Sequence, residues 1–129
     1  MSRILVVDDS GIARKFVIRT LDMSGLEDAE FLEAGDGAEA LEVLESGPAD
    51  LVVSDLNMPN MDGEQLLVKL KESPAFKDIP VLLITSAANE ALRAQLMGQG
   101  AFDVFSKPVS PADLFPVLQR LSLAEGDPE

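Results

Sequence analysis

The chain has 129 residues, no cysteine, no histidine and a formal net charge of -13 at pH 7. Its 47% hydrophobic and 26% charged residues indicate one folded globular domain. The missing residue types exclude disulfides, thiolate metal sites and imidazole chemistry, so a nucleophile must be a carboxylate, hydroxyl or amine. The negative charge opposes direct nucleic-acid binding, and no apolar run approaches the roughly 20 residues that span a bilayer. We therefore expect a cytoplasmic protein without membrane insertion.

The first predicted elements are a strand and a helix. Arg3 to Asp8 has the apolar run of a buried strand. Ser10 can cap a following helix, because its hydroxyl can accept a hydrogen bond from the first turn. We expect one face of this helix to carry four apolar residues, Ile12, Phe16, Val17 and Leu21.

A second strand and helix follow. Glu30 to Ala34 predicts a shorter strand, and Asp36 can cap the next helix. Gly47 and Pro48 supply the stop signal of this helix. The residues expected to face inward are Ala40, Leu41, Val43 and Leu44.

The rest of the chain repeats the alternation. Strands are expected at about residues 50–55, 80–85 and 102–106, with helices near 63–73, 88–98 and 111–122. Short apolar strands separated by helices predict an α/β fold with a doubly wound, five-stranded parallel sheet and five helices on its two faces. Ligands of such sheets bind beyond the carboxyl ends of the strands.

Chemically active side chains stand at these strand ends. Asp8 and Asp9 close the first run, Asp55 the third, Thr85 the fourth, and Lys107 follows the fifth. Each has a structural interpretation, as a helix cap, an Asx-turn residue, a strand-end hydroxyl or a solvated surface charge. Their joint occurrence at one edge of the sheet favours a functional site.

Three converging carboxylates repel one another and raise each other's pKa unless a cation is present. Oxygen ligands and water suit Mg²⁺, particularly beside a phosphate. Asp55 can then serve as a nucleophile in phosphoryl transfer, with Asp8 and Asp9 holding the metal. The Thr85 hydroxyl can act as a donor and Lys107 as a counterion.

Four motifs carry a family resemblance: VVDDS at 6–10, DLNMPNMDG at 55–63, LITS at 83–86 and SKP at 106–108. In this order and spacing they resemble the receiver domain of bacterial response regulators in two-component phosphorelays. Stand-alone chemotaxis regulators of the CheY type are the nearest resemblance. It implies a CheY-like, flavodoxin-like fold with strand order 2-1-3-4-5.

The resemblance also implies roles for the acidic residues. Asp55 would accept a phosphoryl group from a histidine kinase or a phosphotransfer protein. Asp9, Asp55 and the backbone carbonyl of Asn57 would ligate Mg²⁺, and Asp8 would act mainly through a metal-bound water.

Further roles are implied for the remaining motif residues. Thr85 would move toward the phosphoryl group, Lys107 would bridge to it, and the small Ser86 would leave room for entry. Asn57 and Ala87 occupy positions that tune slow self-dephosphorylation in the family. The protein would therefore be a signalling phosphoacceptor, not an enzyme in the usual sense.

One position departs from the family pattern. Many relatives have an aromatic switch residue three positions before the lysine, where this chain has Val104. Phe105 should point to the opposite side of its strand, because side chains alternate. The resemblance places the output surface at about Ala88 to Gly98 and Asp103 to Leu121, for an unidentified protein target or an activation-dependent dimer.

We expect residues 1–123 to form the receiver domain and 124–129 a short acidic tail.

Two other classes of function compete with the interpretation as a receiver domain. A phosphate-independent pseudo-receiver usually lacks the acceptor, the acidic pair or the lysine, and all are present here. A Mg²⁺-dependent phosphohydrolase of the haloacid dehalogenase type needs acids two residues apart after the first strand, whereas Asp8 and Asp9 are adjacent. A flavodoxin is disfavoured by the lack of a hydroxyl-rich phosphate loop.

Overall fold

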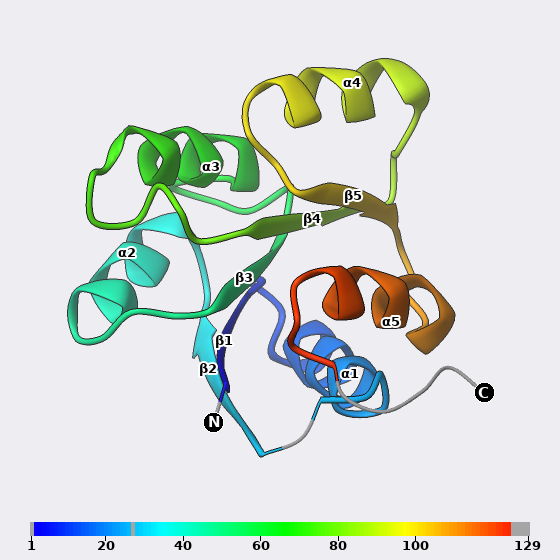
Figure 1. Ribbon diagram of the computed structural model, residues 1–129. Helices are drawn as coiled ribbons and strands as arrows, with labels where there is room; N and C mark the ends of the chain where they lie inside the picture. Colours follow the sequence, from blue (N-terminus) through cyan, green and yellow to red (C-terminus); the bar gives the residue numbers. More distant parts are fainter. Residues whose placement is uncertain (1, 27, 125–129) are drawn as a thin grey trace.

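The computed structural model describes residues 2–26 and 28–124. Strands and helices alternate along this part of the chain (Figure 1). The elements in chain order are β1 (Ser2–Val7), α1 (Gly11–Asp22), β2 (Ala29–Ala34), α2 (Gly37–Glu45), β3 (Leu51–Asp55), α3 (Gly63–Glu72), β4 (Val81–Thr85), α4 (Glu90–Gly98), β5 (Asp103–Ser106) and α5 (Pro111–Arg120). Within the described residues, no helix is both long and apolar enough to cross a bilayer.

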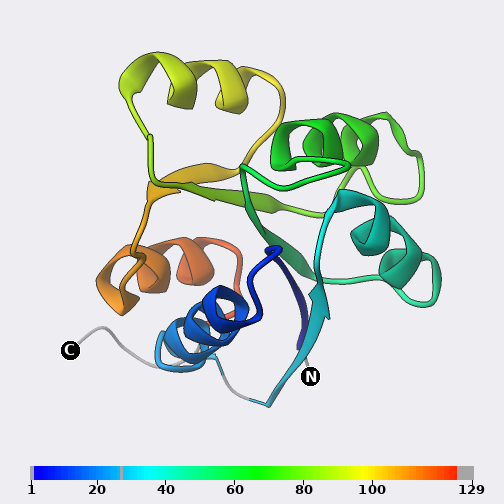
Figure 2. The same ribbon diagram turned by 180° about the vertical axis from the view of Figure 1, so that it is seen from behind.

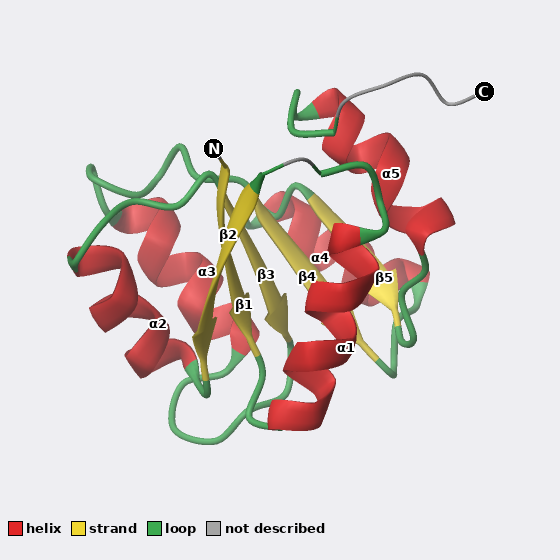
Figure 3. Cartoon of the chain, turned by 90° about the horizontal axis from the view of Figure 1, so that it is seen from below, coloured by secondary structure: helices red, strands yellow, loops and turns green. Residues whose placement is uncertain are grey.

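The five strands form one parallel sheet in the order β2-β1-β3-β4-β5. This confirms the predicted fold class and strand order. All arrowheads lie at the same end of the sheet in Figure 3, so the carboxyl ends of the strands share one edge. Helices α1 and α5 cover one face, while α2, α3 and α4 cover the other, as the two opposite views show (Figures 1 and 2).

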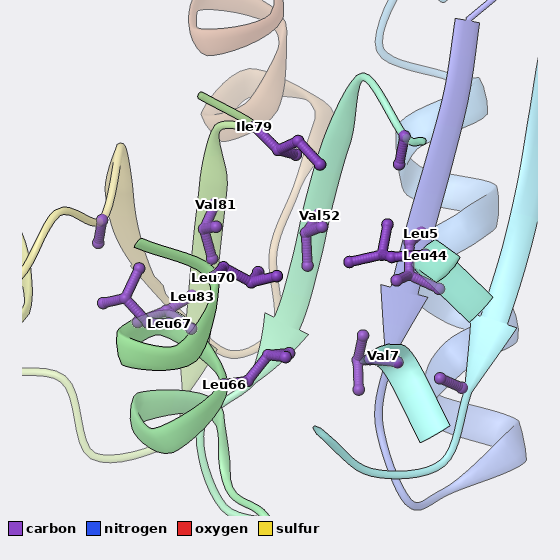
Figure 4. Packing of buried hydrophobic residues seen from close by; sticks show 14 of the residues in the cluster. Leu5, Val7, Leu44, Val52, Leu66, Leu67, Leu70, Ile79, Val81 and Leu83 are labelled. Atoms are coloured by element: carbon purple, nitrogen blue, oxygen red, sulfur yellow. The ribbon is translucent and has the colours of Figure 1, made fainter. Parts of the chain in front are cut away.

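Apolar side chains fill both faces of the central strands. Leu5 and Val7 point toward the helices α2 and α3, together with Leu83 of β4 (Figure 4). Ile4 and Val6 point to the opposite face, against α1 and α5. Burial on both faces explains why these strands have continuous rather than alternating apolar sequences. This burial also makes the carboxyl ends of the strands a rigid support for the side chains that follow them.

Helix starts follow side-chain caps. Ser10 accepts a hydrogen bond from the Ala13 N–H, and Asp36 accepts one from Glu39, as predicted. Helix α4 begins at Glu90, two residues later than predicted, because Asn89 is its N-cap. The boundaries of β1 and α5 also differ slightly from the predicted ones, which is usual because the ends of strands and helices fray.

The prediction of one apolar face on α1 is wrong. Val17 and Leu21 are buried, but Ile12 and Phe16 are 86% and 50% exposed. Successive helical residues are about 100° apart, so Val17 lies well around the helix from Phe16. Helix α1 therefore has a buried apolar side and a second, exposed one.

Candidate functional site

The edge of the sheet brings together the residues expected to act. Asp8 follows β1, Asp55 and Thr85 end β3 and β4, and Lys107 follows β5. The Lys107 Nζ lies 2.8 Å from Oδ1 of Asp55 and 3.7 Å from Oδ2 of Asp8. Hydrogen bonds in the backbone fix these positions: the Leu56 N–H donates to the Ile84 carbonyl, and the Lys107 N–H donates to the Thr85 carbonyl.

Three carboxylates form the acidic part of the site. Asp8, Asp9 and Asp55 each offer an oxygen, and these oxygens lie within 4.8 Å of one another. Asp8 and Asp55 are buried, whereas Asp9 is exposed. A hard cation that keeps several water ligands fits this arrangement, since one side of the group faces solvent.

Burial and neighbouring charges perturb two of these groups. Burial raises the pKa of Asp8, as do the carboxylates of Asp55 and Asp9, against the hydrogen bond from Ser10 and the charge of Lys107. Burial alone would lower the pKa of Lys107, but its hydrogen bond to Asp55 and the surrounding acids raise that pKa overall. The Lys107 ammonium is therefore stabilised in its protonated form, whereas ionisation of the neighbouring Asp8 carboxyl is unfavourable.

The raised pKa of Asp8 predicts an effect of Asp8→Asn on stability. In the unfolded chain Asp8 ionises at its ordinary pKa of about 3.9, but in the folded protein it ionises only at higher pH. Ionising Asp8 therefore destabilises the folded protein, and this destabilisation grows as the pH rises from the unfolded pKa through the folded pKa. In EDTA at pH 7, Asp8→Asn should therefore have a larger free energy of unfolding than the wild type, measured by urea denaturation and circular dichroism. The difference should vanish near pH 3. Asn keeps an oxygen that can accept the hydrogen bond from Ser10.

Mg²⁺ bound at this acidic group should reduce the difference in stability between Asp8→Asn and the wild type. Saturation at 100 times the dissociation constant stabilises a protein by about 2.7 kcal/mol, and Asp8→Asn should gain less than the wild type. A variant less stable than the wild type in EDTA, or equally stabilised by Mg²⁺, would contradict the prediction.

The other predicted residues lie around this group. Thr85 is fully buried, and its Oγ1 accepts a hydrogen bond from the Ala87 N–H at 3.2 Å. Ser86, Ala87 and Asn57 are exposed. Within the described residues, no hydrogen bond joins Thr85 to Asp55, so Thr85 lies near the site in the sheet but its hydroxyl does not contact Asp55.

The side chains of Val104 and Phe105 face opposite sides of the sheet, as predicted. Val104 is buried in the cluster beneath α2, α3 and α4, and Phe105 packs against the cluster beneath α1 and α5. Asp103, at the start of β5, binds Arg93 of α4 at 2.6 Å and Arg120 of α5 at 3.3 Å. No motif in the sequence predicts this ion-pair network.

The sequence patterns did not predict two further features of the site. A cavity of about 360 Å³ opens beside Asp55 and Lys107, and the exposed Ile12 and Phe16 of α1 line it. Gly63 at the start of α3 leaves no room for a side chain, since an added Cβ would collide with the Asp55 carbonyl oxygen. The glycine of the DLNMPNMDG motif was a possible signal for this close approach.

The fold and the site define a class: a doubly wound α/β domain with an acidic group and a lysine at the carboxyl edge of its sheet. The model of the response regulator receiver domain matches residues 4–119. The chain therefore belongs to the response regulator receiver domain family of two-component signalling, and it is CheY-like in fold.

Individual relatives agree with this assignment. The chemotaxis protein CheY1 of Helicobacter pylori is 36% identical over 84% of this chain and 87% of its own length. The sensor histidine kinase TmoS of Ectopseudomonas mendocina is also 36% identical, over 87% of this chain, but the chain spans only 11% of that kinase. The structure of the chemotaxis response regulator CheY4 of Vibrio cholerae has a TM-score of 0.80 at 32% identity, covering 94% of this chain and 98% of CheY4.

Proposed function

We propose that Asp55 accepts a phosphoryl group from the phosphohistidine of a histidine kinase or a phosphotransfer protein, and that this changes the affinity of the domain for a protein target. The contact between Lys107 and Asp55, at the centre of a three-carboxylate group, carries the proposal. An ammonium so placed can donate both to the acceptor and to a phosphoryl group bound there.

The chemical step needs little beyond alignment and charge compensation. An oxygen of Asp55 attacks phosphorus, the new O–P bond forms as the P–N bond breaks, and the departing imidazole nitrogen keeps the electron pair. Lys107 contacts only one oxygen of the Asp55 carboxylate, and within the described residues no other side chain donates to that carboxylate. The second oxygen is therefore free to attack.

Asp8, Asp9 and Asp55, with the backbone carbonyl of Asn57, would hold Mg²⁺. The close carboxylate oxygens and the raised pKa of Asp8 support this assignment, because both indicate a site that lacks positive charge. When bound, Mg²⁺ supplies charge compensation for the transferring phosphoryl oxygens.

The remaining site residues take supporting roles in this proposal. Thr85 would exchange its hydrogen bond with Ala87 for one to the phosphoryl group, and the small, exposed Ser86 leaves access to it. Asn57 and Ala87 would tune slow self-dephosphorylation. Residues 1–123 would form the functional domain, with 124–129 as a tail, of which residues 125–129 lie outside the described part of the chain.

Signalling would reach a target, or a second copy, through the surface made by α4, β5 and α5. Val104 in the aromatic-switch position leaves no aromatic ring to rotate there. The network of Arg93, Asp103 and Arg120 joins these three elements and would take part in the response.

Acetyl phosphate with Mg²⁺, followed by intact-mass measurement, tests the proposed chemistry. An adduct of about 80 Da, the mass of one HPO₃, should form in Mg²⁺ and not in EDTA. No adduct under either condition would favour a phosphate-independent binding module, whereas many turnovers of small phosphate esters would favour a phosphohydrolase.

The exposed side of α1 predicts where a phosphodonor protein docks. Ile12 and Phe16 lie at the cavity beside Asp55, so an apolar side chain of the donor can be buried there. Loss of such a contact costs about 1.5–3 kcal/mol, roughly 10- to 100-fold in affinity. Ile12→Asp should slow transfer from a phosphotransfer domain that phosphorylates the wild type, measured with the radiolabelled donor.

A matched control variant separates the loss of the docking contact from the effect of the added negative charge. Met23, 67% exposed beyond the other end of α1, gives the variant Met23→Asp with the same change in net charge. Phosphorylation by acetyl phosphate should be unchanged in both variants. Equal slowing by Ile12→Asp and Met23→Asp, or slowing with acetyl phosphate, would count against the docking site.

A further inference from the structure

Arg14 of α1 contacts the backbone of the acidic site. Its Nη1 donates a hydrogen bond of 2.7 Å to the Asp8 carbonyl oxygen, and its Nε donates one of 2.9 Å to Oε1 of Glu33 on β2. The Arg14 side chain is only 23% exposed. One guanidinium thus joins the turn after β1 to the neighbouring strand.

The carbonyl that Arg14 holds belongs to the peptide group between Asp8 and Asp9. On the other side of Asp8, its N–H donates to the Ala34 carbonyl at 3.0 Å. The Ser10 N–H donates to the Asp8 carboxylate. Asp9 is exposed, and within the described residues its side chain makes no hydrogen bond or ion pair. The direction of the Asp9 carboxylate therefore depends on how this peptide plane is fixed.

Lys15 is a natural contrast to Arg14. Its Nζ binds the other oxygen of Glu33 at 2.7 Å, but its side chain is 71% exposed and makes no described contact with Asp8. Both residues carry one positive charge near the same acids, and only Arg14 holds the backbone of the site.

We propose that Arg14 is a positioning residue for divalent-cation binding: it fixes the peptide plane between Asp8 and Asp9, and Glu33 fixes Arg14. The inference rests on the proposed Mg²⁺ site and adds a residue to it. Arg14 acts through backbone geometry, because its own charge would repel a cation and is compensated by Glu33.

Titration calorimetry with Mg²⁺ alone separates geometry from charge. Removing a cation near the site should by electrostatics tighten Mg²⁺ binding, equally in Arg14→Ala and Lys15→Ala. Positioning instead predicts about tenfold weaker binding in Arg14→Ala, the size expected for a lost hydrogen bond from a charged donor, and no weakening in Lys15→Ala. Arg14→Lys should recover part of the affinity, and Glu33→Gln should lose part of it.

Amide hydrogen exchange in EDTA gives a readout without metal. The N–H groups of Asp8 and Ser10 are hydrogen-bonded, so their exchange should accelerate in Arg14→Ala and not in Lys15→Ala, with circular dichroism confirming that both variants are folded. Equal Mg²⁺ affinities of Arg14→Ala and Lys15→Ala, or unchanged exchange at Ser10, would overturn the role of Arg14. A wild type that binds no Mg²⁺ would instead remove the proposed cation site itself.

Discussion

Asp55→Asn is expected to take up no phosphoryl group from acetyl phosphate and Mg²⁺. The amide has nearly the shape of the carboxylate but lacks its negative charge and is a far weaker nucleophile. Lys107 also loses the carboxylate that it contacts at 2.8 Å. Intact-mass measurement should show the adduct of about 80 Da in the wild type and none in the variant.

Asp22→Asn is the matched control, because it makes the same chemical change at an exposed residue at the end of α1. It should be phosphorylated like the wild type. An adduct that survives in Asp55→Asn at the wild-type level would assign the acceptor to another residue and remove the basis of the proposed function.

Gly63→Ala is expected to reduce both stability and phosphorylation. A Cβ at this position would collide with the Asp55 carbonyl oxygen and lie 2.9 Å from the Leu56 Cα, and both are backbone atoms that cannot rotate away. The Gly63 N–H also donates to the Leu56 carbonyl, so α3 and the end of β3 are held together there. We expect the free energy of unfolding to fall by about 2 kcal/mol or more, as for other overpacked positions.

Gly98→Ala is the control for this variant. An added Cβ at Gly98, the last residue of α4, meets no atom within 4 Å. Alanine in a helix should then be neutral or stabilise by up to about 1 kcal/mol. Urea denaturation followed by circular dichroism measures both. A Gly63→Ala protein as stable as the wild type and phosphorylated at the same rate would show that the backbone shifts without cost.

The sequence predicted the elements and the convergence of the strand ends because both follow from local patterns. Apolar runs such as Val81 to Ile84 define buried strands, and parallel strands place their carboxyl ends at one edge. The proximity of Lys107 to Asp55, which lies 52 residues earlier in the chain, followed from topology alone.

Other features depend on contacts that no local pattern records. The spacing of the apolar residues of α1 predicts one shared face, but Phe16 and Val17 are adjacent and point in different directions. The contact of Arg14 with the Asp8 carbonyl and the binding of Arg93 to Asp103 join elements whose distance is set by packing. An arginine on an exposed helix has no sequence signal that distinguishes such a role from a solvated charge.

The most direct test of the central claim locates the phosphoryl group on the chain. After reaction with acetyl phosphate and Mg²⁺, borohydride reduces an acyl phosphate on an aspartate to the alcohol of homoserine, and peptide mass spectrometry identifies the converted residue. The account predicts homoserine at position 55 alone. Conversion at Asp8, at Asp9 or at an aspartate outside the site, with Asp55 unchanged, would contradict it.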